Sequence, residues 1–366
     1  MHYIVLARKW RPQSFDSIIG QNHIITTLLN SFTLNKIHQS WIFYGTRGVG
    51  KTTIARLLSK SLNCKNRNQI YSCNKCKNCK NIQLGCFPDI IEVDAASKTR
   101  VENIKEILDT VKYIPIQGKF KIYLIDEVHM LSKHSFNALL KILEEPPKYA
   151  KFILITTNIN KVPDTIISRC MYFYFTPIDI TDIKKNLINI LNEEKIFFEE
   201  EAVHIIAEKS EGSIRDSLNL TEQVMMFSNQ KITLDSVFKI FGMISKEKVL
   251  NIILSIFKKN TIKLFKILKK IYNSNIDLEK ILIEILKIFH KIAIIIIKKS
   301  QKKKKRSYHT EKIIEISKKI NFSELKKYYQ IILNGRKNLF LAPNKKIGIE
   351  ITLLNLLNEI KNKIIF

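Results

Sequence analysis

Gly45-Thr46-Arg47-Gly48-Val49-Gly50-Lys51-Thr52 decides the fold of this chain, because it matches the phosphate-binding pattern G-x-x-x-x-G-K-[ST]. The strand-like run 40–44 precedes it and the helix-like run 53–61 follows it. In such a loop the glycines allow backbone N–H groups to surround phosphates at a helix N-terminus. We expect Lys51 to reach the outer phosphates and the Thr52 hydroxyl to bind Mg²⁺. An ordinary glycine-rich turn is the alternative interpretation.

Short runs rich in β-branched and aromatic residues alternate with amphipathic stretches over residues 1–178. The runs are residues 40–44, 89–93, 121–125 and 152–155. Strands that alternate with helices indicate an open parallel sheet with helices on both faces, so we expect an α/β domain over 1–178. The strand pattern ends after Pro177. Residues 179–242 and 243–366 show helical spacing instead, and we predict two further all-α domains there.

Two carboxylates follow the buried-strand pattern of residues 121–125. They are Asp126 and Glu127, and the carboxyl ends of parallel strands are where such sheets bind ligands. We expect Asp126 to hold Mg²⁺ through water and Glu127 to polarise the water that attacks the γ-phosphate. A helix cap is the alternative interpretation of an isolated acidic pair.

The run 152–155 leads into three small polar residues, Thr156, Thr157 and Asn158. At a strand tip their side chains can hydrogen-bond the attacking water or the γ-phosphate, and we assign this role to Thr157. Turn chemistry explains the same residues nearly as well. Both interpretations therefore remain open.

Arginine is scarce in this sequence, since only ten of its 61 lysine and arginine residues are arginines. Each arginine is therefore informative, because lysine cannot imitate a planar, bidentate guanidinium. Arg169 follows Ser168 at the rim of the predicted α/β domain, where it can enter a neighbouring subunit's site; a local salt bridge is the alternative. Arg215 stands in the helix-start pattern of residues 213–216 and can reach a γ-phosphate; a buried ion pair is the alternative.

The net charge of +28 suggests a polyanionic partner such as nucleic acid. A composition bias that replaces arginine by lysine is the favoured source of the excess. The most basic run, residues 301–306, is expected to be a solvated loop between helices rather than a DNA-binding patch.

Cysteines are concentrated in one polar stretch after the helix that follows the phosphate loop. Cys64, Cys73, Cys76 and Cys79 have the spacing C-x₈-C-x₂-C-x₂-C. Four thiolates so close together in a reducing compartment predict a structural Zn²⁺ site that folds an insertion over about 64–79. An iron–sulfur cluster and a disulfide pair are weaker alternatives. Cys86 is expected to lie outside the metal site.

We expect a cytoplasmic protein without a membrane segment. The longest purely apolar run, residues 292–297, is far shorter than the roughly 20 residues that cross a bilayer. The N-terminus has no basic start followed by an apolar core and a small-residue cleavage site.

Together these residues resemble a known family, the gamma/tau subunits of bacterial DNA polymerase III, which are the AAA+ ATPases of clamp loaders. The resemblance covers essentially the whole chain and is densest before residue 220. It rests on residues 6–12, the phosphate loop 45–52, the four-cysteine module, and the stretches 126–132, 135–141, 143–147 and 168–170.

The resemblance implies an α/β P-loop AAA+ domain with a zinc-binding insertion, followed by a small helical lid domain and a helical collar that forms the oligomer. It places residues 6–12 near the adenine of ATP. It also implies that Lys51 and Thr52 hold the phosphates, that Arg169 completes a neighbouring subunit's site, and that Arg215 senses the nucleotide from the lid. The residues expected at the adenine are Ala7, Arg11 and Pro12.

As a function, the resemblance implies ATP-driven loading of a sliding clamp onto primer–template DNA by a hetero-oligomer. ATP, Mg²⁺ and Zn²⁺ are the expected cofactors. Family members usually continue beyond the collar, whereas this chain stops at Phe366, so we expect no direct tether to polymerase or helicase. Two other classes remain as alternatives: an AAA+ branch-migration or helicase motor, and a nucleotide-sensing scaffold that binds ATP without hydrolysing it.

Overall fold

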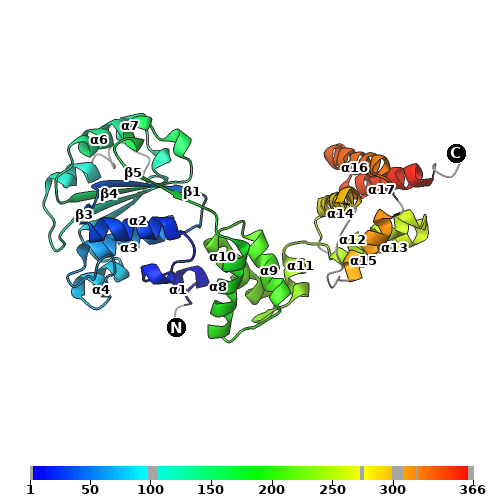
Figure 1. The fold of residues 1–366 in the computed structure, drawn as a ribbon, viewed down its shortest axis with the longest axis horizontal. Coiled ribbons are helices and arrows are strands. Elements are labelled where there is room, and N and C mark those ends of the chain that lie inside the picture. The colour runs from blue at the N-terminus through cyan, green and yellow to red at the C-terminus, as the bar shows by residue number, and fades with distance from the viewer. Residues whose placement is uncertain (1–2, 98–105, 273–275, 299–307, 319, 362–366) are drawn as a thin grey trace. The chain divides into compact units, whose positions relative to one another are not determined.

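A five-stranded parallel sheet forms the centre of the N-terminal part of the computed structural model, which describes residues 3–97, 106–272, 276–298, 308–318 and 320–361 (Figure 1). Its strand order is β2-β3-β4-β1-β5. The strands are β1 (Ser40–Gly45), β2 (Ile90–Asp94), β3 (Lys121–Asp126), β4 (Ala150–Thr156) and β5 (Met171–Phe175). Every pairing is parallel, which confirms the expected α/β sheet.

Helices cover both faces of this sheet, as Figure 1 shows. On one face, α2 (Asn22–Thr33) and α3 (Lys51–Asn63) pack against apolar side chains of β1 and β4. On the other, α6 (Lys133–Glu144) and α7 (Asp164–Ile167) do the same. Strand β4 lies between β3 and β1 and is buried along its whole length, because a parallel sheet covered on both sides has no face in water.

The register aligns the carboxyl ends of neighbouring strands at one edge of the sheet. Tyr44 of β1 pairs with Thr156 of β4, and Asp94 of β2 pairs with Asp126 of β3. The residues that follow β1, β3 and β4 therefore meet at the carboxyl edge, where parallel sheets bind ligands.

Short elements connect the sheet to its surroundings. They are α1 (Leu6–Lys9), α4 (Lys77–Leu84) and the 3₁₀ turns η1 (Phe15–Ser17), η2 (Thr110–Lys112), η3 (Val128–Met130) and η4 (Ile159–Lys161). Turn η3 directly follows the acidic pair at the end of β3, and α4 follows three of the four clustered cysteines.

Three helices follow the sheet: α8 (Ile180–Glu193), α9 (Glu200–Lys209) and α10 (Ile214–Phe227). The expected helix start at Ser213 is confirmed, because its side chain accepts a hydrogen bond from the backbone N–H of Asp216. Two-residue strands, β6 (Phe197–Phe198) between α8 and α9 and β7 (Lys231–Ile232) after α10, pair in parallel. The sequence did not indicate this pairing, since runs of two residues carry no periodic pattern.

The contact pattern divides the chain into two compact units, residues 1–232 and 233–366. The division predicted from the sequence, at 1–178, 179–242 and 243–366, stays a prediction. The basic run at 301–306 lies outside the described residues.

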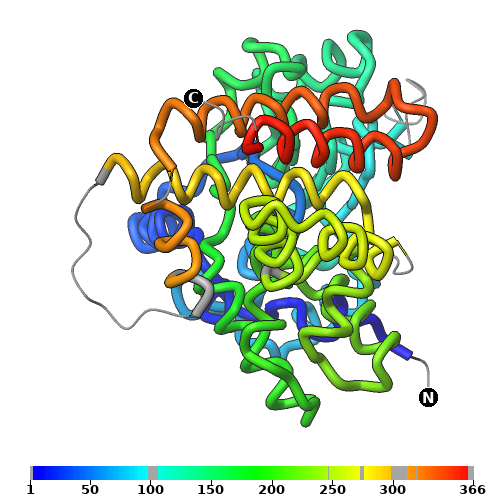
Figure 2. Tube along the Cα trace, turned by 90° about the vertical axis from the view of Figure 1, so that its right-hand side faces the viewer, coloured from blue at the N-terminus to red at the C-terminus, as the bar shows by residue number. Residues whose placement is uncertain are grey.

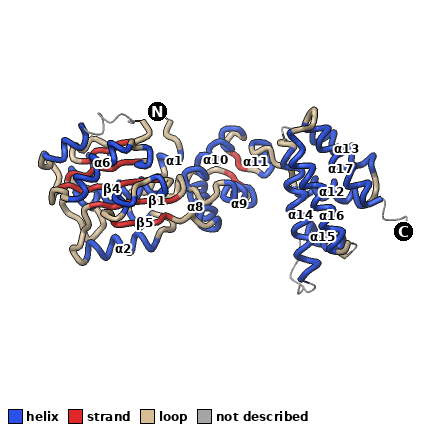
Figure 3. Tube along the Cα trace, turned by 90° about the horizontal axis from the view of Figure 1, so that it is seen from above, coloured by secondary structure: helices blue, strands red, loops and turns tan. Residues whose placement is uncertain are grey.

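Helices and loops make up the described part of the second unit (Figure 3). Helix α14 lies beside α16, and α16 lies beside α17 (Figure 2). The helices are α11 (Leu234–Ile240), α12 (Lys246–Phe257), α13 (Thr261–Tyr272), α14 (Glu279–Lys298), α15 (Tyr308–Ser317), α16 (Phe322–Lys337) and α17 (Lys345–Lys361), with turn η5 (Asn338–Phe340). No described helix is long and apolar enough to span a membrane.

Helix α17 is buried along one side. Leu353 and Leu356 are among the residues that join the core of this unit. The helix approaches α16 so closely that a Cβ atom at Gly335 would lie 2.2 Å from the Thr352 side chain. Ile347 and Ile351 nevertheless remain exposed, so part of the apolar surface of α17 has no cover within the described chain.

Candidate nucleotide site and cysteine cluster

The phosphate loop joins β1 to α3, and the helix begins at Lys51 directly after Gly50, whose φ is +100°. Lys51 is buried, and its Nζ donates hydrogen bonds to the carbonyl oxygens of Gly45, at 2.7 Å, and Thr46, at 2.6 Å. Burial lowers the pKa of Lys51, while the nearby carboxylates Glu127 and Asp126 act in the opposite direction. The ammonium group is thus held at the helix N-terminus, where an anion is favoured.

Thr52 and Asp126 lie together although 74 residues separate them in the sequence. The Thr52 hydroxyl donates to Asp126 Oδ2 at 3.0 Å. Burial raises the pKa of Asp126, and the bond from Thr52 opposes this effect. A hydroxyl and a carboxylate beside a phosphate loop are hard oxygen ligands, which suit Mg²⁺.

Glu127 turns its carboxylate toward the end of β4. Its backbone is in the left-handed region, with φ at +49°. Its Oε2 accepts hydrogen bonds from the Thr157 hydroxyl at 2.9 Å and from the Thr157 backbone N–H at 3.3 Å. The structure therefore brings Thr157 to the predicted general base.

A second side chain at this carboxylate, His129, was not assigned a role from the sequence. Its Nδ1 lies 3.3 Å from Glu127 Oε2 and 2.9 Å from the Thr156 hydroxyl oxygen. A histidine two residues beyond the acidic pair was the only signal available in the sequence.

The start of helix α10 touches the phosphate loop. The backbone N–H groups of Ile214 and Arg215 donate to the carbonyl oxygen of Gly48 at 3.1 and 3.4 Å. A Cβ atom at Gly48 would lie 1.9 Å from Ser213 Oγ, so only glycine permits this approach. Arg215 consequently stands at the predicted phosphate-binding edge.

The N-terminal segment that carries Ala7, Arg11 and Pro12 is fastened to the helices after the sheet. The backbone N–H of Leu6 and the Tyr3 hydroxyl both donate to the Glu222 carboxylate on α10. The hydrogen bond from Tyr3 to Glu222 raises the pKa of Tyr3 to about 12. Trp10 Nε1 donates to Glu194 at 2.7 Å, at the end of α8. The segment therefore packs beside the same helix bundle that reaches the phosphate loop.

Arg169 follows α7 and is partly exposed. Its Nη2 donates to Glu144 Oε1 at 2.9 Å, and its Nη1 donates to the Thr165 carbonyl at 2.8 Å. The local salt bridge, the alternative interpretation from the sequence, is therefore present in the single chain. These hydrogen bonds hold the guanidinium against α6 and α7 rather than against Lys51, Thr52 or Asp126.

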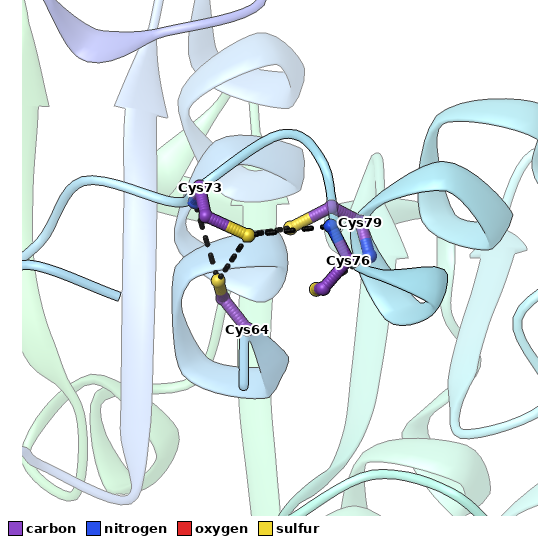
Figure 4. Close-up of side chains that lie close together, drawn as sticks. All are labelled: Cys64, Cys73, Cys76 and Cys79. Carbon is purple, nitrogen blue, oxygen red and sulfur yellow. Dashed lines mark hydrogen bonds between the residues drawn. The ribbon is translucent and has the colours of Figure 1, made fainter. Parts of the chain in front are cut away.

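The four clustered cysteines converge at the junction of α3 and α4 (Figure 4). Their four Sγ atoms all lie within 4.8 Å of one another. Cys64 and Cys73 have sulfurs 3.5 Å apart, and those of Cys73 and Cys79 are 4.0 Å apart. Tetrahedral Zn–S bonds of about 2.3 Å place sulfurs about 3.8 Å apart, so this donor set fits zinc.

Backbone hydrogen bonds and burial shift the pKa values of these thiols in opposite directions. The N–H groups of Cys76 and Lys75 lower the pKa of Cys73 to about 6, which favours the thiolate that a metal requires. Burial raises the pKa of Cys79 and Cys64. All four thiols are free, and Cys86 is exposed and outside the cluster.

Family models cover nearly the whole chain. A model described as DNA polymerase III, delta subunit, matches residues 20–179. The model of the DNA polymerase III clamp loader subunit ATPase lid domain matches 182–230, and that of domain III of subunits gamma and tau matches 232–363.

Full-length relatives show the same similarity. The chain is 47% identical to DNA polymerase III subunit gamma of Buchnera aphidicola subsp. Baizongia pistaciae, over 98% of both chains. It is 42% identical to subunit tau of Escherichia coli, over 98% of this chain and 56% of that one. The chain thus spans almost all of the gamma subunit and about half of the tau subunit.

Among solved structures, the Holliday junction branch migration motor of Thermotoga maritima aligns with 73% of this chain at 18% identity and a TM-score of 0.47.

Proposed function

The chain belongs to the family of gamma and tau subunits of bacterial DNA polymerase III, which makes it an AAA+ clamp-loader ATPase, and we propose that it is the motor that couples ATP turnover to clamp loading. In this proposal ATP binding produces the state that opens a ring-shaped clamp and grips primer–template DNA. Hydrolysis of ATP then releases both.

One observation carries the proposal: a buried lysine, a hydroxyl–carboxylate pair and a second carboxylate meet at the carboxyl edge of the sheet. Lys51 is the cation for the β- and γ-phosphates, and the loop 45–50 supplies backbone N–H groups. Thr52 and Asp126 would hold Mg²⁺, which neutralises charge on the phosphates when bound.

Glu127 is the group that orients and polarises the attacking water. Its carboxylate is half-exposed and lies beside Thr157, which is suited to hydrogen-bond the same water or the γ-phosphate. A scaffold that only binds ATP needs no such carboxylate, so these contacts support hydrolysis.

Arg215 and the N-terminal segment make the site responsive to nucleotide. Because Arg215 N donates to Gly48, a phosphate in the loop changes the surroundings of the α10 helix start directly. Ala7, Arg11 and Pro12 are proposed to contact the adenine, and their segment is fastened to α10 through Glu222. Nucleotide binding and lid position are therefore coupled from two sides.

Arg169 is proposed to act on the site of a neighbouring subunit. Its guanidinium is partly exposed, and Glu144 holds it by a single hydrogen bond between exposed groups, which costs little to break. In the assembled loader the side chain would exchange this partner for the transition-state phosphate of the neighbour.

Zinc is proposed for Cys64, Cys73, Cys76 and Cys79, because the sulfur separations and the free thiols suit a closed Cys₄ site. The metal would supply folding free energy to the module, which has few buried apolar residues of its own, and no catalysis.

Other clamp-loader subunits, the sliding clamp and primer–template DNA are the proposed partners, in the cytoplasm. Lysine contacts to the backbone phosphates of DNA would bind it independently of its base sequence. Part of the net charge of +28 would then serve DNA binding. The proposed domains are residues 1–178, 179–242 and 243–366.

The test is ATP hydrolysis by the chain alone and with its partner subunits, the clamp and primed DNA. The proposal expects slow basal turnover that rises when all components are present. Absence of hydrolysis in the full mixture would favour a nucleotide-sensing scaffold, and processive strand separation would favour a helicase motor.

A further inference from the structure

His129 is a polar side chain beside the general base, and the proposed cycle so far gives it no role. It belongs to turn η3 and its side chain is only 11% exposed, against 31% for Glu127. Its Nδ1 faces two oxygen atoms, Glu127 Oε2 at 3.3 Å and Thr156 Oγ1 at 2.9 Å. This partly buried ring nitrogen lies between the end of β4 and the carboxylate.

The hydrogen bonds of Thr156 determine which way this contact runs. Thr156 Oγ1 donates its hydrogen to the Asn158 carbonyl at 3.1 Å and accepts from the Asn158 N–H, also at 3.1 Å. With its hydrogen directed to the Asn158 carbonyl, the Thr156 oxygen accepts from His129. A hydrogen on Nδ1 suits both neighbours, because the Glu127 carboxylate oxygen 3.3 Å away can also only accept.

The two side chains beside Glu127 Oε2, Thr157 and His129, are expected to respond differently to a bound nucleotide. Thr157 supplies its hydroxyl and its N–H, and the proposed cycle directs that hydroxyl to the γ-phosphate or the attacking water. His129 is anchored by Thr156, which is fully buried at the end of β4. If Thr157 turns to the nucleotide, this anchor keeps His129 in place.

We propose that His129 is a positioning residue for ATP hydrolysis: through Nδ1–H it holds the Glu127 carboxylate beside the attacking water after the Thr157 hydroxyl has been diverted. This inference rests on the proposed role of Glu127. It assigns to Thr156, the buried hydroxyl before Thr157, the task of fixing the histidine tautomer.

The test uses substitutions that separate the hydrogen bond from the ring. His129→Ala removes the donor and should lower kcat by about 10-fold to 100-fold, the effect of losing one hydrogen bond to a charged group. ATP affinity should change by less than about 3-fold, because no phosphate contact is lost. His129→Asn places an amide N–H close to the position of Nδ1 and should recover most of the lost kcat.

Two further variants separate the positioning role from a general effect of substitution. His134→Ala, on the exposed side of α6, is the matched control and should retain the parental kcat. Thr156→Val removes the acceptor that anchors His129 and should lower kcat. The double variant with His129→Ala should be no slower than His129→Ala alone, because both changes break one relay.

Three outcomes would overturn the inference: unchanged kcat in His129→Ala, equal loss of kcat in His129→Asn and His129→Ala, or additive losses in the double variant. If His129→Ala fails to fold, as judged by thermal unfolding, Thr156→Val and His129→Asn still decide. Glu127→Gln keeps the two failures apart. If it hydrolyses ATP normally, the proposed function fails; if it is inactive while the His129 variants are normal, only the positioning role fails.

Discussion

Gly48 has no Cβ atom, and this allows the start of helix α10 to approach the phosphate loop closely. Gly48 has φ at +76°, and the Ser213 side chain occupies the space that a Cβ would fill. Because the N–H groups of Ile214 and Arg215 bind the Gly48 carbonyl, this residue joins the loop to the helix that carries the proposed nucleotide sensor.

Gly48→Ala should therefore weaken ATP binding by at least about 10-fold, since the helix start must move away from the loop. Its matched control is Gly85→Ala, where φ is +75° and nothing lies within 4 Å of the added Cβ. Both variants carry the left-handed strain of about 1 kcal/mol, and only Gly48→Ala carries the collision. Equal ATP affinity in the two variants, measured by titration calorimetry, would show that the contact between loop and lid is unimportant.

Arg169 should act in trans. We expect Arg169→Ala to leave ATP affinity and basal hydrolysis of the isolated chain nearly unchanged, because its hydrogen bonds go to Glu144 and Thr165. In the assembled loader it should remove most hydrolysis, since an arginine finger contributes about 10³–10⁵ in rate. Phosphate release in both states measures this.

Glu144→Gln is the control for the salt bridge. It weakens the ion pair with Arg169 but leaves the guanidinium in place, so the assembled loader should keep its rate of ATP hydrolysis. A parallel loss in the isolated Arg169→Ala chain would mean that the arginine acts in cis.

At the scale of elements, the cysteine module should bind one zinc ion without contributing to the nucleotide site. Cys76→Ser should lose the metal, because a closed site requires all four thiolates. Cys86→Ser is the matched control and should retain it, since this thiol lies outside the cluster. Metal analysis with ATP titration on both variants measures the outcome. Iron with visible absorbance, or retained zinc in Cys76→Ser, would refute the assignment.

The sheet and its phosphate loop were predictable from the sequence because their signals are local. Apolar runs marked β1, β3 and β4, and one motif marked the turn between β1 and α3. The cysteine cluster was predictable for the same reason, since its ligands fall within sixteen residues.

The contacts that sequence could not provide are those set by packing. Glu222 meets Leu6 across 216 residues, and Arg169 meets Glu144 only because α7 follows α6 on the same face of the sheet. The contact between His129 and Thr156 needs the end of β4 beside turn η3, which follows from strand order rather than from composition.

For the whole molecule, the second unit presents apolar side chains that its own helices leave exposed. Leu341 is 84% exposed and Ile351 is 52% exposed, next to a well-buried core. We expect these residues to contribute to subunit contacts in the proposed collar, because apolar surface of this kind is costly to leave in water.

Leu341→Lys combined with Ile351→Lys should weaken assembly with partner subunits and leave ATP affinity unchanged. Both side chains are exposed, so the changes leave intact the core to which Leu353 and Leu356 of α17 belong. Asn358→Lys, which adds a lysine at an exposed polar residue of α17, is the control. Light scattering after size exclusion measures assembly, and normal assembly of the double variant would place the collar contacts elsewhere.

The most direct test of the motor function compares Lys51→Ala with Glu127→Gln in the reassembled loader, with retention of clamp and primed DNA as the measurement. Lys51→Ala should lose ATP binding and capture neither, because its buried ammonium is the cation for the phosphates. Glu127→Gln should bind ATP and hydrolyse it at least about 10²-fold more slowly. It should therefore hold clamp and DNA in a complex that does not release them. Prompt release by Glu127→Gln, or equal loss of ATP binding in both variants, would contradict the account.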